Sequence, residues 1–423
     1  MSEPHPSVEL VTIGTELLLG TTVDDNGAWL GRTLAETGVG VVRRATVPDH
    51  AGAIRSAVEA ALRRTGTVIC TGGLGPTPDD LTRTAVAELY DVPLILDESW
   101  LDVVRKRFRD RGLDMPESNC VQAQVPRGAT LFANANGTAP GLAIDTPERG
   151  LTILLPGVPR EMRALTTTHV VPFLLQRFRS LSNPIVSRVV RTTGISESAL
   201  AERIDDLVES MSPITVAYLP AGTGEDVRLT IWGVLPRAEA NLALDRAERA
   251  LKERLGPLVY GIDEADLAGV VADRLRTLGL SLALAESCTG GLVAKRLTDA
   301  PGASDFFRAG FVTYSNEAKV ALLGVAAEAI ARHGAVSETV VRAMADGVCA
   351  AGSSDCGLAI TGVAGPGGGS ADKPVGTVWI AATVRGDTTA RLLRLGGDRD
   401  EIRERAAQAA LALLLRLLEE VRS

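Results

Sequence analysis

Residues 281–291, SLALAESCTGG, join an apolar segment to a polar turn, and a helix-like segment, LVAKRLTDA, follows at once. A short apolar run that stops at polar and glycine residues is typical of a buried strand. The stretch therefore predicts a strand that ends in a tight turn and leads directly into a helix. Ser287 stands in that turn, where its hydroxyl is either a helix cap or a reactive group.

The same order of strand and helix recurs on both sides of this junction. In residues 7–170, strand-like segments such as VELVTIG and TVICTGG alternate with helix-like segments such as AGAIRSAVEAALRRTG. From about residue 263 the alternation resumes, and it ends in the long helix-like segment RDEIRERAAQAALALLLRLLEEV. This alternation predicts α/β domains in which helices cover mostly parallel sheets.

Residues 180–262 have a different pattern, with segments in the order β-α-β-β-α, which predicts a small α+β module. A chain of 423 residues is also long for one hydrophobic core. We therefore expect three domains, at residues 1–175, 176–262 and 263–423.

The composition argues against several classes of protein. A net charge of −8 and an aromatic content of 4% favour neither a basic nucleic-acid surface nor stacking platforms. The five cysteines form no CxxC pair, which is typical of reduced thiols in the cytoplasm. The N-terminus lacks a signal-peptide pattern, and the apolar run ALALLLRLLEEV, interrupted by Arg416, is too short to span a membrane. We expect a cytoplasmic protein with no membrane and no nucleic-acid partner.

Three loops in the N-terminal region follow predicted strands and contain glycines or carboxylates: GTELLLGTTVDDN (14–26), TGGLGPTPDDLT (71–82) and NANGTAPG (134–141). Ligands of open α/β sheets bind at the carboxyl ends of strands. Glycines let backbone N–H groups approach a phosphate, and nearby carboxylates can hold Mg²⁺. The alternatives are that the glycines only form turns and that Asp80 only caps a helix.

The C-terminal region offers a candidate base for Ser287. A serine hydroxyl is a weak nucleophile, and the segment VTYSNEAKVALLG places Tyr314 and Lys319 after another predicted strand. A lysine that is buried enough to lose its proton can act as a base. The alternatives are a solvated lysine and a tyrosine at the edge of the core. Further polar groups come from the helix start after Ser287, where backbone amides can bind an oxyanion or a phosphate, and from the loop in AITGVAGPGGG.

Cys288 is a rival nucleophile. A thiol needs a cationic partner to become a thiolate, and strand alternation should direct only one of Ser287 and Cys288 toward the site. We favour Ser287.

TGGLGPTPDDLT resembles the Gly-Gly-Thr-Gly…Asp-x-Thr signature of the molybdopterin-binding family, with Leu74 where that family commonly has Thr. Together with TIGTELLLG, NGTAPG and LPGVPREM, it resembles the CinA family, the competence/damage-inducible protein A proteins. The resemblance implies a molybdopterin-binding-like three-layer domain with nucleotide pyrophosphatase activity on ADP-ribose-like diphosphates and a divalent metal. It implies metal or water-activation roles for Glu16, Asp24 and Asp80, and phosphate or nucleotide contacts for Gly72, Gly73, Asn136 and Thr138.

The segments ESCTGGLVAKRLTDAPGASDFFRAGFVTYSNEAK, GAVSE and ITGVAGPGGGSADKPVGTVWIA resemble the C-terminal domain of CinA proteins, the nicotinamide-nucleotide amidase (PncC) family. The resemblance implies hydrolysis of nicotinamide mononucleotide to nicotinate mononucleotide and ammonia, with no cofactor. Ser287 would be the nucleophile, Lys319 the base and Tyr314 an assisting group. The residues expected around the substrate are Thr289, Gly290, Gly291, Thr361, Gly362 and, as a phosphate clamp, Arg399.

In this family the middle module is a KH-like connector. A KH domain binds single strands through a GXXG loop between two helices, and no such loop lies between helices in residues 180–262. We expect small pyridine and adenine nucleotides as ligands and a homodimer as the assembly. The alternatives are a non-catalytic nucleotide-binding partner in competence or DNA-damage responses, and a molybdopterin-binding protein.

Overall fold

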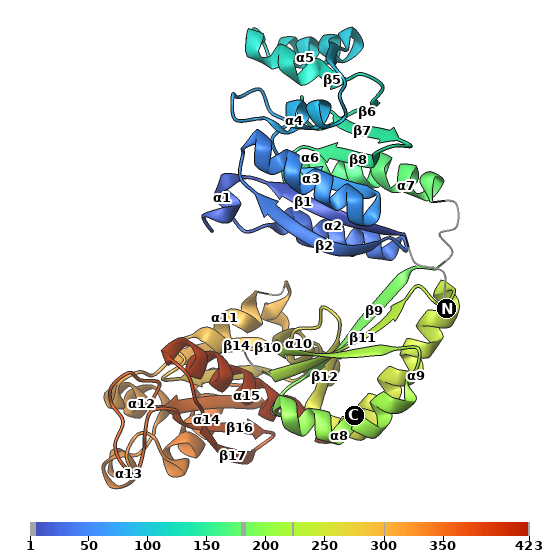
Figure 1. Cartoon of the computed structure of the whole chain (residues 1–423). Coiled ribbons are helices and arrows are strands. Elements are labelled where there is room, and N and C mark those ends of the chain that lie inside the picture. The colour runs from blue at the N-terminus through green and yellow to red at the C-terminus, as the bar shows by residue number, and fades with distance from the viewer. Residues whose placement is uncertain (1–5, 179–182, 222–223, 300, 422–423) are drawn as a thin grey trace. The chain divides into compact units, whose positions relative to one another are not determined.

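The computed structural model describes residues 6–178, 183–221, 224–299 and 301–421 (Figure 1). The chain forms two compact units. The N-terminal unit contains the residues up to Val186 together with Ile231–Asn241, and the C-terminal unit contains Ser187–Thr230 and the residues from Leu242 onward. Within the described residues, no helix is both long enough and apolar enough to cross a membrane.

The N-terminal unit is built on a six-stranded sheet in the order β2-β1-β3-β8-β7-β6. Its first four strands are parallel, and the last two run antiparallel to their neighbours. The strands are β1 (Ser7–Ile13), β2 (Gly40–Val47), β3 (Thr67–Thr71), β6 (Thr130–Phe132), β7 (Gly141–Thr146) and β8 (Gly150–Leu155).

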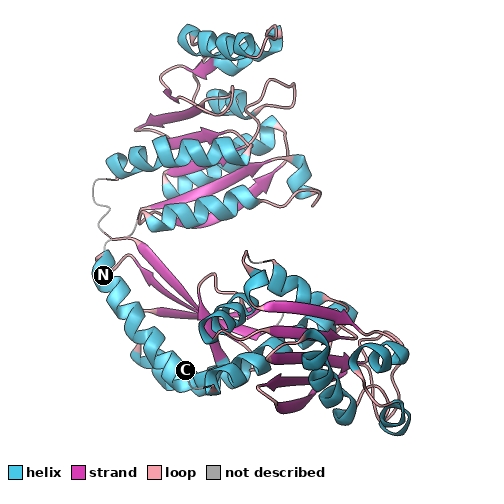
Figure 2. Cartoon of the chain, turned by 180° about the vertical axis from the view of Figure 1, so that it is seen from behind, coloured by secondary structure: helices cyan, strands magenta, loops and turns pink. Residues whose placement is uncertain are grey.

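Alternating side chains of β1 divide the apolar interior of this unit into two cores. Val8 and Leu10 pack with side chains of α2, α6 and α7, whereas Val11 and Ile13 pack with side chains of α3 and α4. Because successive side chains of a strand point to opposite faces, the helices cover both faces of the sheet, as Figure 2 shows. This confirms the three-layer domain. The helices are α2 (Asp25–Glu36), α3 (Ala51–Thr65), α4 (Thr82–Leu89), α6 (Pro159–Leu165) and α7 (Val171–Arg177).

Between α4 and β8 the chain forms elements that the sequence pattern did not predict. They are β4 (Leu94–Leu96), α5 (Glu98–Asp110), the 3₁₀ helix η1 (Glu117–Ala123), β5 (Gln124–Pro126), β6 and β7. Three of the four strands have only three residues, so they contain too little alternation to show a period. α5 begins with Asp97, whose carboxylate accepts a hydrogen bond from the Trp100 N–H at 2.9 Å.

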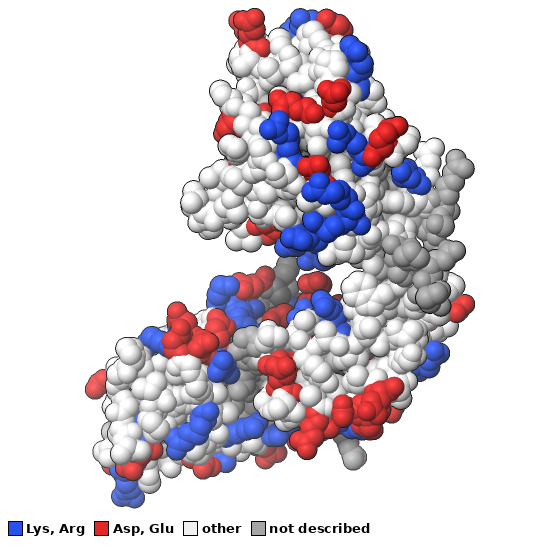
Figure 3. All heavy atoms as spheres, viewed as in Figure 1, with Lys and Arg blue, Asp and Glu red and all other residues white. Residues whose placement is uncertain are grey.

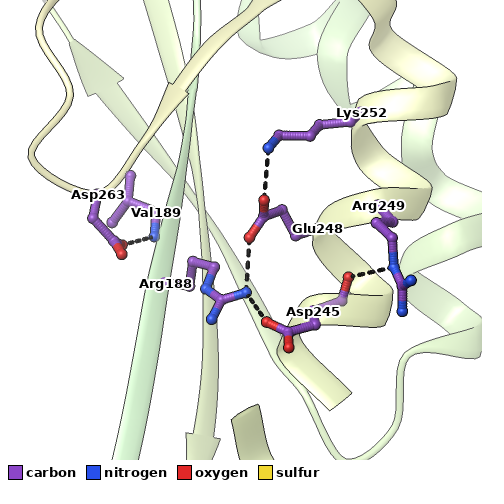
Figure 4. Close-up of polar contacts among 7 residues, drawn as sticks. All are labelled: Arg188, Val189, Asp245, Glu248, Arg249, Lys252 and Asp263. Atoms are coloured by element: carbon purple, nitrogen blue, oxygen red, sulfur yellow. Dashed lines mark hydrogen bonds and ion pairs between the residues drawn. The ribbon is translucent and has the colours of Figure 1, made fainter. Parts of the chain in front are cut away.

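The connector has the expected β-α-β-β-α order and one further strand. Its sheet runs β10-β11-β9-β12. Figure 4 shows how α9 is held to this sheet: Arg188 of β9 lies 2.6 Å from Asp245 and 2.7 Å from Glu248, both on α9. The elements are β9 (Ile185–Thr192), α8 (Glu197–Ser210), β10 (Thr215–Ala221), β11 (Gly224–Trp232), α9 (Arg237–Leu255) and β12 (Val259–Ile262).

The C-terminal domain is built on a five-stranded sheet in the order β14-β13-β15-β16-β17. β13 lies between two parallel neighbours, and β16 and β17 extend the sheet as an antiparallel hairpin. The strands are β13 (Leu282–Glu286), β14 (Phe307–Val312), β15 (Cys356–Gly362), β16 (Thr377–Val384) and β17 (Asp387–Arg394).

β13 has a different core on each face. Leu282 and Leu284 pack with α10, α11 and α15, whereas the smaller Ala283 and Ala285 pack with α12, α13 and α14. The apolar part of the stretch SLALAESCTGG is therefore a central strand that is covered on both faces, as expected. The helices are α10 (Leu267–Leu278), α11 (Leu292–Thr298), α12 (Asn316–Leu323), α13 (Ala327–His333), α14 (Glu338–Gly352) and α15 (Arg399–Glu420).

Candidate active sites

The turn after β13 is organised by Glu286. Its buried carboxylate accepts hydrogen bonds from the backbone N–H groups of Gly291 at 3.0 Å, Val293 at 3.2 Å and Ala294 at 2.9 Å. These are the N–H groups that a helix N-terminus leaves without partners, and a negative charge there is favourable. Glu286 therefore serves as the anchor of the α11 N-terminus, and the hydroxyl of Ser287 remains available for another role.

Ser287 meets Lys319 inside the domain. Lys319 lies on α12 with only 1% of its surface exposed, and its Nζ is 3.2 Å from Ser287 Oγ. The same nitrogen lies 2.8 Å from the carbonyl oxygen of Thr313 and 3.4 Å from those of Tyr314 and Ser315. Burial lowers the pKa of the Lys319 amine below its ordinary value, because the charged form loses its hydration. A neutral amine beside a serine hydroxyl is positioned to accept its proton.

A cavity of about 200 Å³ opens onto this pair. It brings together six of the residues predicted from the sequence: Ser287, Tyr314, Lys319, Thr361, Gly362 and Arg399. Residues from three strand ends and from α12 and α15 thus meet at one edge of the sheet, where ligands of α/β sheets bind. The cavity is also lined by four residues that were not predicted from the sequence: Asn316, Ala335, Val336 and Ala364.

Three predicted binding residues do not line this cavity. The Gly290 N–H donates to the Ser287 carbonyl at 3.1 Å, and the Gly291 N–H donates to Glu286. Thr289 is fully buried, and its hydroxyl has no hydrogen-bond partner among the described residues. The amides expected to bind an oxyanion are therefore used, at Gly290 and Gly291, to build the start of α11.

Tyr314 and Arg399 form the outer part of the site. The exposed Tyr314 hydroxyl accepts a hydrogen bond from Arg399 Nη2 at 3.0 Å, and Arg399 Nη1 donates to the Gly365 carbonyl at 2.5 Å. Two fixed contacts hold the guanidinium in one orientation at the cavity, where it can bind an anionic group of a ligand. Tyr314 thus positions Arg399 through its hydroxyl.

Cys288 also lines the cavity, so the expectation that alternation would direct only one of the two residues there is wrong. The strand ends at Glu286, and the period of two does not continue into the turn. Burial raises the pKa of the Cys288 thiol to about 11, so that it stays protonated near neutral pH. This chemistry favours Ser287 as the nucleophile.

A second cavity, of about 460 Å³, lies at the carboxyl ends of the parallel strands in the N-terminal unit. It brings together the predicted residues Glu16, Gly72, Gly73, Thr138 and Asp80. Gly72 has a φ of +110°, and a Cβ at this position would lie 2.2 Å from the Ile13 carbonyl oxygen, so only glycine fits there. Asp49, Asp79, Gln122 and Glu161 also line this cavity and were not predicted. Asp49 lies two residues after the end of β2, which is a signal that could have identified it.

Two predicted residues lie outside the second cavity. Asp24 caps α2, where its Oδ1 accepts a hydrogen bond from the Gly27 N–H at 2.8 Å. Asn136 is exposed, and its backbone N–H donates to Asn134 Oδ1 at 2.9 Å. The structure therefore does not bring Asp24 together with Glu16 and Asp80.

The remaining carboxylates of this cavity do not form a complete metal site. Among the described residues, no three His, Cys, Asp or Glu side chains converge as ligands for one ion. Asp80 Oδ1 already accepts from the Gly75 N–H at 2.7 Å, and its Oδ2 accepts from the Thr77 N–H at 2.9 Å. Mg²⁺ needs only one or two carboxylates when substrate phosphates supply further oxygen ligands, and both Glu16 and Asp80 line the cavity.

Comparison with known proteins gives consistent matches along the chain. Family models match the CinA C-terminal domain at residues 264–418, a probable molybdopterin binding domain at 9–176 and the CinA KH domain at 187–261. A CinA-like protein from Gemmatimonas aurantiaca is 47% identical over 410 residues, which cover 97% of this chain and 96% of that protein. A CinA-like protein from Gloeobacter violaceus is 45% identical over 416 residues, which cover 97% and 96%.

Among solved structures, the competence/damage inducible protein CihA from Agrobacterium tumefaciens is 43% identical to the part it matches. The match covers 36% of this chain and 93% of that one, with a TM-score of 0.35. The three domain models and the full-length relatives show that the chain belongs to the CinA family, with a molybdopterin-binding-like domain, a KH-like connector and a CinA C-terminal domain.

Proposed function

We propose that the C-terminal domain is an amidase that hydrolyses nicotinamide mononucleotide to nicotinate mononucleotide and ammonia. The observation that carries the proposal is the buried Lys319 amine, 3.2 Å from Ser287 Oγ in a cavity of about 200 Å³. A serine becomes a nucleophile when a base accepts its proton, and a lysine with a lowered pKa is such a base.

The first half of the reaction forms an acyl-enzyme. Ser287 Oγ attacks the carboxamide carbon while Lys319 Nζ accepts the hydroxyl proton. A neutral amine has two N–H bonds, which are directed at the carbonyl oxygens around it, and one lone pair for this proton. When the tetrahedral intermediate collapses, the C–N bond breaks and the Lys319 ammonium returns the proton to the leaving nitrogen, which departs as ammonia.

The second half restores the enzyme. A water molecule attacks the ester carbon, and Lys319 Nζ accepts one of its protons. The bond between the carbonyl carbon and Ser287 Oγ breaks, the serine oxygen regains a proton from Lys319, and the product leaves as a carboxylic acid that loses its remaining proton to solvent. Serine and lysine thus end each cycle in their initial protonation states.

Other lining residues suit the remaining parts of this substrate. Arg399 can pair with the 5′-phosphate, because a guanidinium matches phosphate oxygens in a bidentate way. Thr361 donates its hydroxyl proton to the Ala335 carbonyl at 3.0 Å, so its oxygen lone pairs remain able to accept from the carboxamide NH₂ group. Positioning both ends of the nucleotide would place the carboxamide carbon at Ser287.

The test is ammonia release from nicotinamide mononucleotide by the purified full chain, with and without EDTA, beside the Ser287→Ala variant. We expect release by the wild-type chain in both conditions and a loss of more than about 10³-fold in the variant. Binding of the nucleotide without release would instead support a non-catalytic nucleotide-binding partner. Full activity of Ser287→Ala would refute the assignment of the nucleophile.

We propose as a second activity the cleavage of ADP-ribose-like diphosphates in the N-terminal unit. The supporting observation is a glycine-lined cavity of about 460 Å³ that contains Glu16, Asp80 and further carboxylates. A divalent metal held by Glu16 and Asp80 would neutralise charge on the diphosphate, while the Gly72–Gly73 backbone lets the phosphates approach closely. Leu74, which stands where the molybdopterin-binding signature commonly has Thr, is buried and lines this cavity with an apolar side chain that offers no hydrogen bond to a pterin.

The test of the second activity is formation of AMP from ADP-ribose in the presence of Mg²⁺. We expect Asp80→Asn to lower the rate strongly and Asp24→Asn to leave it nearly unchanged, because Asp24 lies outside the cavity. Equal losses in the two variants would contradict this assignment of the cavity.

A further inference from the structure

A third cavity belongs to neither candidate active site. It has a volume of about 660 Å³ and lies within the C-terminal unit. One wall comes from the connector: the segment before α8, the start of β11 and the segment before β12. The other wall comes from β17 and α15 of the C-terminal domain. We call it the arginine cleft, because four of its lining residues are arginines.

Most of the charged residues that line the arginine cleft are basic. Arg391 and Arg394 come from β17, and Arg405 and Arg416 come from α15. Within the part of the chain that the structure describes, only Arg405 of these four pairs with a carboxylate, Glu401 at 3.9 Å. In a chain with a net charge of −8, several arginines around one cleft leave a local positive potential, which attracts anions. Figure 3 shows basic side chains on the surface of the region where β16 and β17 lie.

The cleft has a single acidic residue against its four arginines. Glu225 of β11 has a buried Oε2 that finds no hydrogen-bond partner among the described residues. Burial, together with the nearby Glu197 and Asp226, raises the pKa of Glu225 above its ordinary value.

The helix α8 adds a further positive contribution. Thr193, Gly194, Ile195 and Ser196 precede its first turn and line the cleft. The side chain of Ser196, the N-cap residue, makes no capping hydrogen bond. The backbone N–H groups at the N-terminus of a helix of 14 residues therefore lie at the cleft, a common arrangement for binding phosphate groups, and Glu197 in the first turn offsets part of their positive charge.

The rest of the cleft is apolar. Leu258, Leu393, Leu395 and Leu413 line it, and its volume is typical of sites for small organic molecules. None of its lining residues is aromatic, which argues against stacking of successive bases of a nucleic acid. The cleft therefore combines a basic wall with an apolar wall that a ring system can cover.

We infer that the arginine cleft binds a nucleoside diphosphate or a similar small nucleotide with at least two negative charges. The phosphates would contact Arg391, Arg394, Arg416 and the α8 N-terminus, and the base would lie against the leucine side chains. This site is separate from the amidase and pyrophosphatase cavities, so the inference stands even if neither proposed activity is found. Because the connector and the C-terminal domain each supply a wall, a bound nucleotide would contact both.

The test uses ADP as the probe, with the full chain in EDTA to suppress metal-dependent binding in the N-terminal cavity. Titration calorimetry is compared between wild type, the double variant Arg391→Ala/Arg416→Ala and the control Arg249→Ala, an exposed arginine of α9 outside the cleft. We expect the double variant to bind ADP at least roughly tenfold more weakly, since two charge-assisted contacts to the phosphates are removed. The control should bind like wild type.

Hydrogen exchange locates the site independently. ADP should protect the backbone around Thr193–Ser196 and Arg391–Leu395 in wild type and not in the double variant. ADP binding that is equally tight in the double variant, or protection confined to the other two cavities, would overturn the inference. The absence of ADP binding by the wild-type chain would also overturn the inference. If inorganic pyrophosphate bound as tightly as ADP, the part of the inference that concerns the nucleoside would be wrong.

Discussion

At the scale of single residues, the chemistry of the C-terminal cavity depends on the burial of one lysine. Lys319 is 1% exposed and has no carboxylate partner within the described residues, so its environment favours the neutral amine. A lowered lysine pKa costs folding stability near neutral pH, because the unfolded chain binds the proton more tightly. The sequence supplied the candidate through the segment VTYSNEAK, but burial depends on how α12 packs, which no local pattern reveals.

Lys319→Met should separate catalysis from stability. Methionine fills a similar volume without an amine, so we expect the rate of ammonia release to fall by about 10²–10⁴-fold. The melting temperature should stay equal or rise, because a desolvated amine is removed. The matched control is Lys295→Met, an exposed lysine of α11 whose partner is Asp299 at 2.6 Å. If activity survives in Lys319→Met, another group is the base.

The lowered pKa of Lys319 also predicts the pH dependence of stability. The unfolded chain keeps a lysine pKa of about 10.4, so between the folded and unfolded values the unfolded state binds more protons. The free energy of unfolding contributed by this group therefore rises with pH through that window. Urea denaturation at pH 7 and pH 10 should show this rise as a difference between wild type and Lys319→Met. Parallel curves for the two proteins would contradict a lowered pKa.

At the scale of elements, the junction between β13 and α11 depends on Glu286. α11 has only seven residues, and three of its N-terminal N–H groups bond to one carboxylate. So short a helix has little intrinsic stability, and its start depends on this cap. The position of Ser287 therefore depends on the residue before it.

Glu286→Gln tests this dependence. The amide keeps one acceptor oxygen but turns an NH₂ group toward backbone N–H groups, so we expect a loss of about 2–3 kcal/mol in the free energy of unfolding. Ammonia release should fall as well, since Ser287 is displaced from Lys319. Chemical denaturation of the variant is compared with Glu404→Gln, an exposed glutamate of α15. Equal stability of the two variants would show that the cap is dispensable.

The length of an element decided whether it could be predicted from the sequence. Long strands and helices such as β1, β13, α3 and α15 were predicted because they span several periods of the apolar pattern. The three-residue strands β4, β5 and β6 span barely one period of the apolar pattern. In β12 all four residues are partly buried, so burial does not alternate along the strand. Candidate binding residues were predicted by their position near strand ends. The structure places Thr361 and Gly73 at the cavities, and it does not place Asp24 or Asn136 in a cavity.

At the scale of the whole molecule, each candidate active site is complete within one unit. Every residue lining the N-terminal cavity precedes Val186, and every residue lining the Ser287–Lys319 cavity follows Leu242. Neither cavity is lined by a side chain from the other unit. The two proposed activities therefore need no shared residue.

This separation predicts that the variants act independently. Ser287→Ala should abolish ammonia release and leave AMP formation from ADP-ribose within about twofold of wild type, and Asp80→Asn should do the reverse, because effects at distant sites without shared partners add. The two assays are run on the same preparations of both single variants and the double variant. A loss of both activities in either single variant would show that the sites are coupled.

The carbonyl groups around Lys319 have a consequence for the divergence of related sequences. The amine is held by the main-chain oxygens of Thr313, Tyr314 and Ser315, which every amino acid at those positions would provide. Mutational drift at Thr313 and Tyr314 can therefore proceed while Lys319 keeps its place, provided that the backbone path is preserved, whereas Ser315 also caps α12 by accepting a hydrogen bond from the Ala318 N–H at 3.1 Å. A distant homologue could retain the serine and the lysine with different residues between β14 and α12. A sequence search that scores the residues of that segment would overlook it.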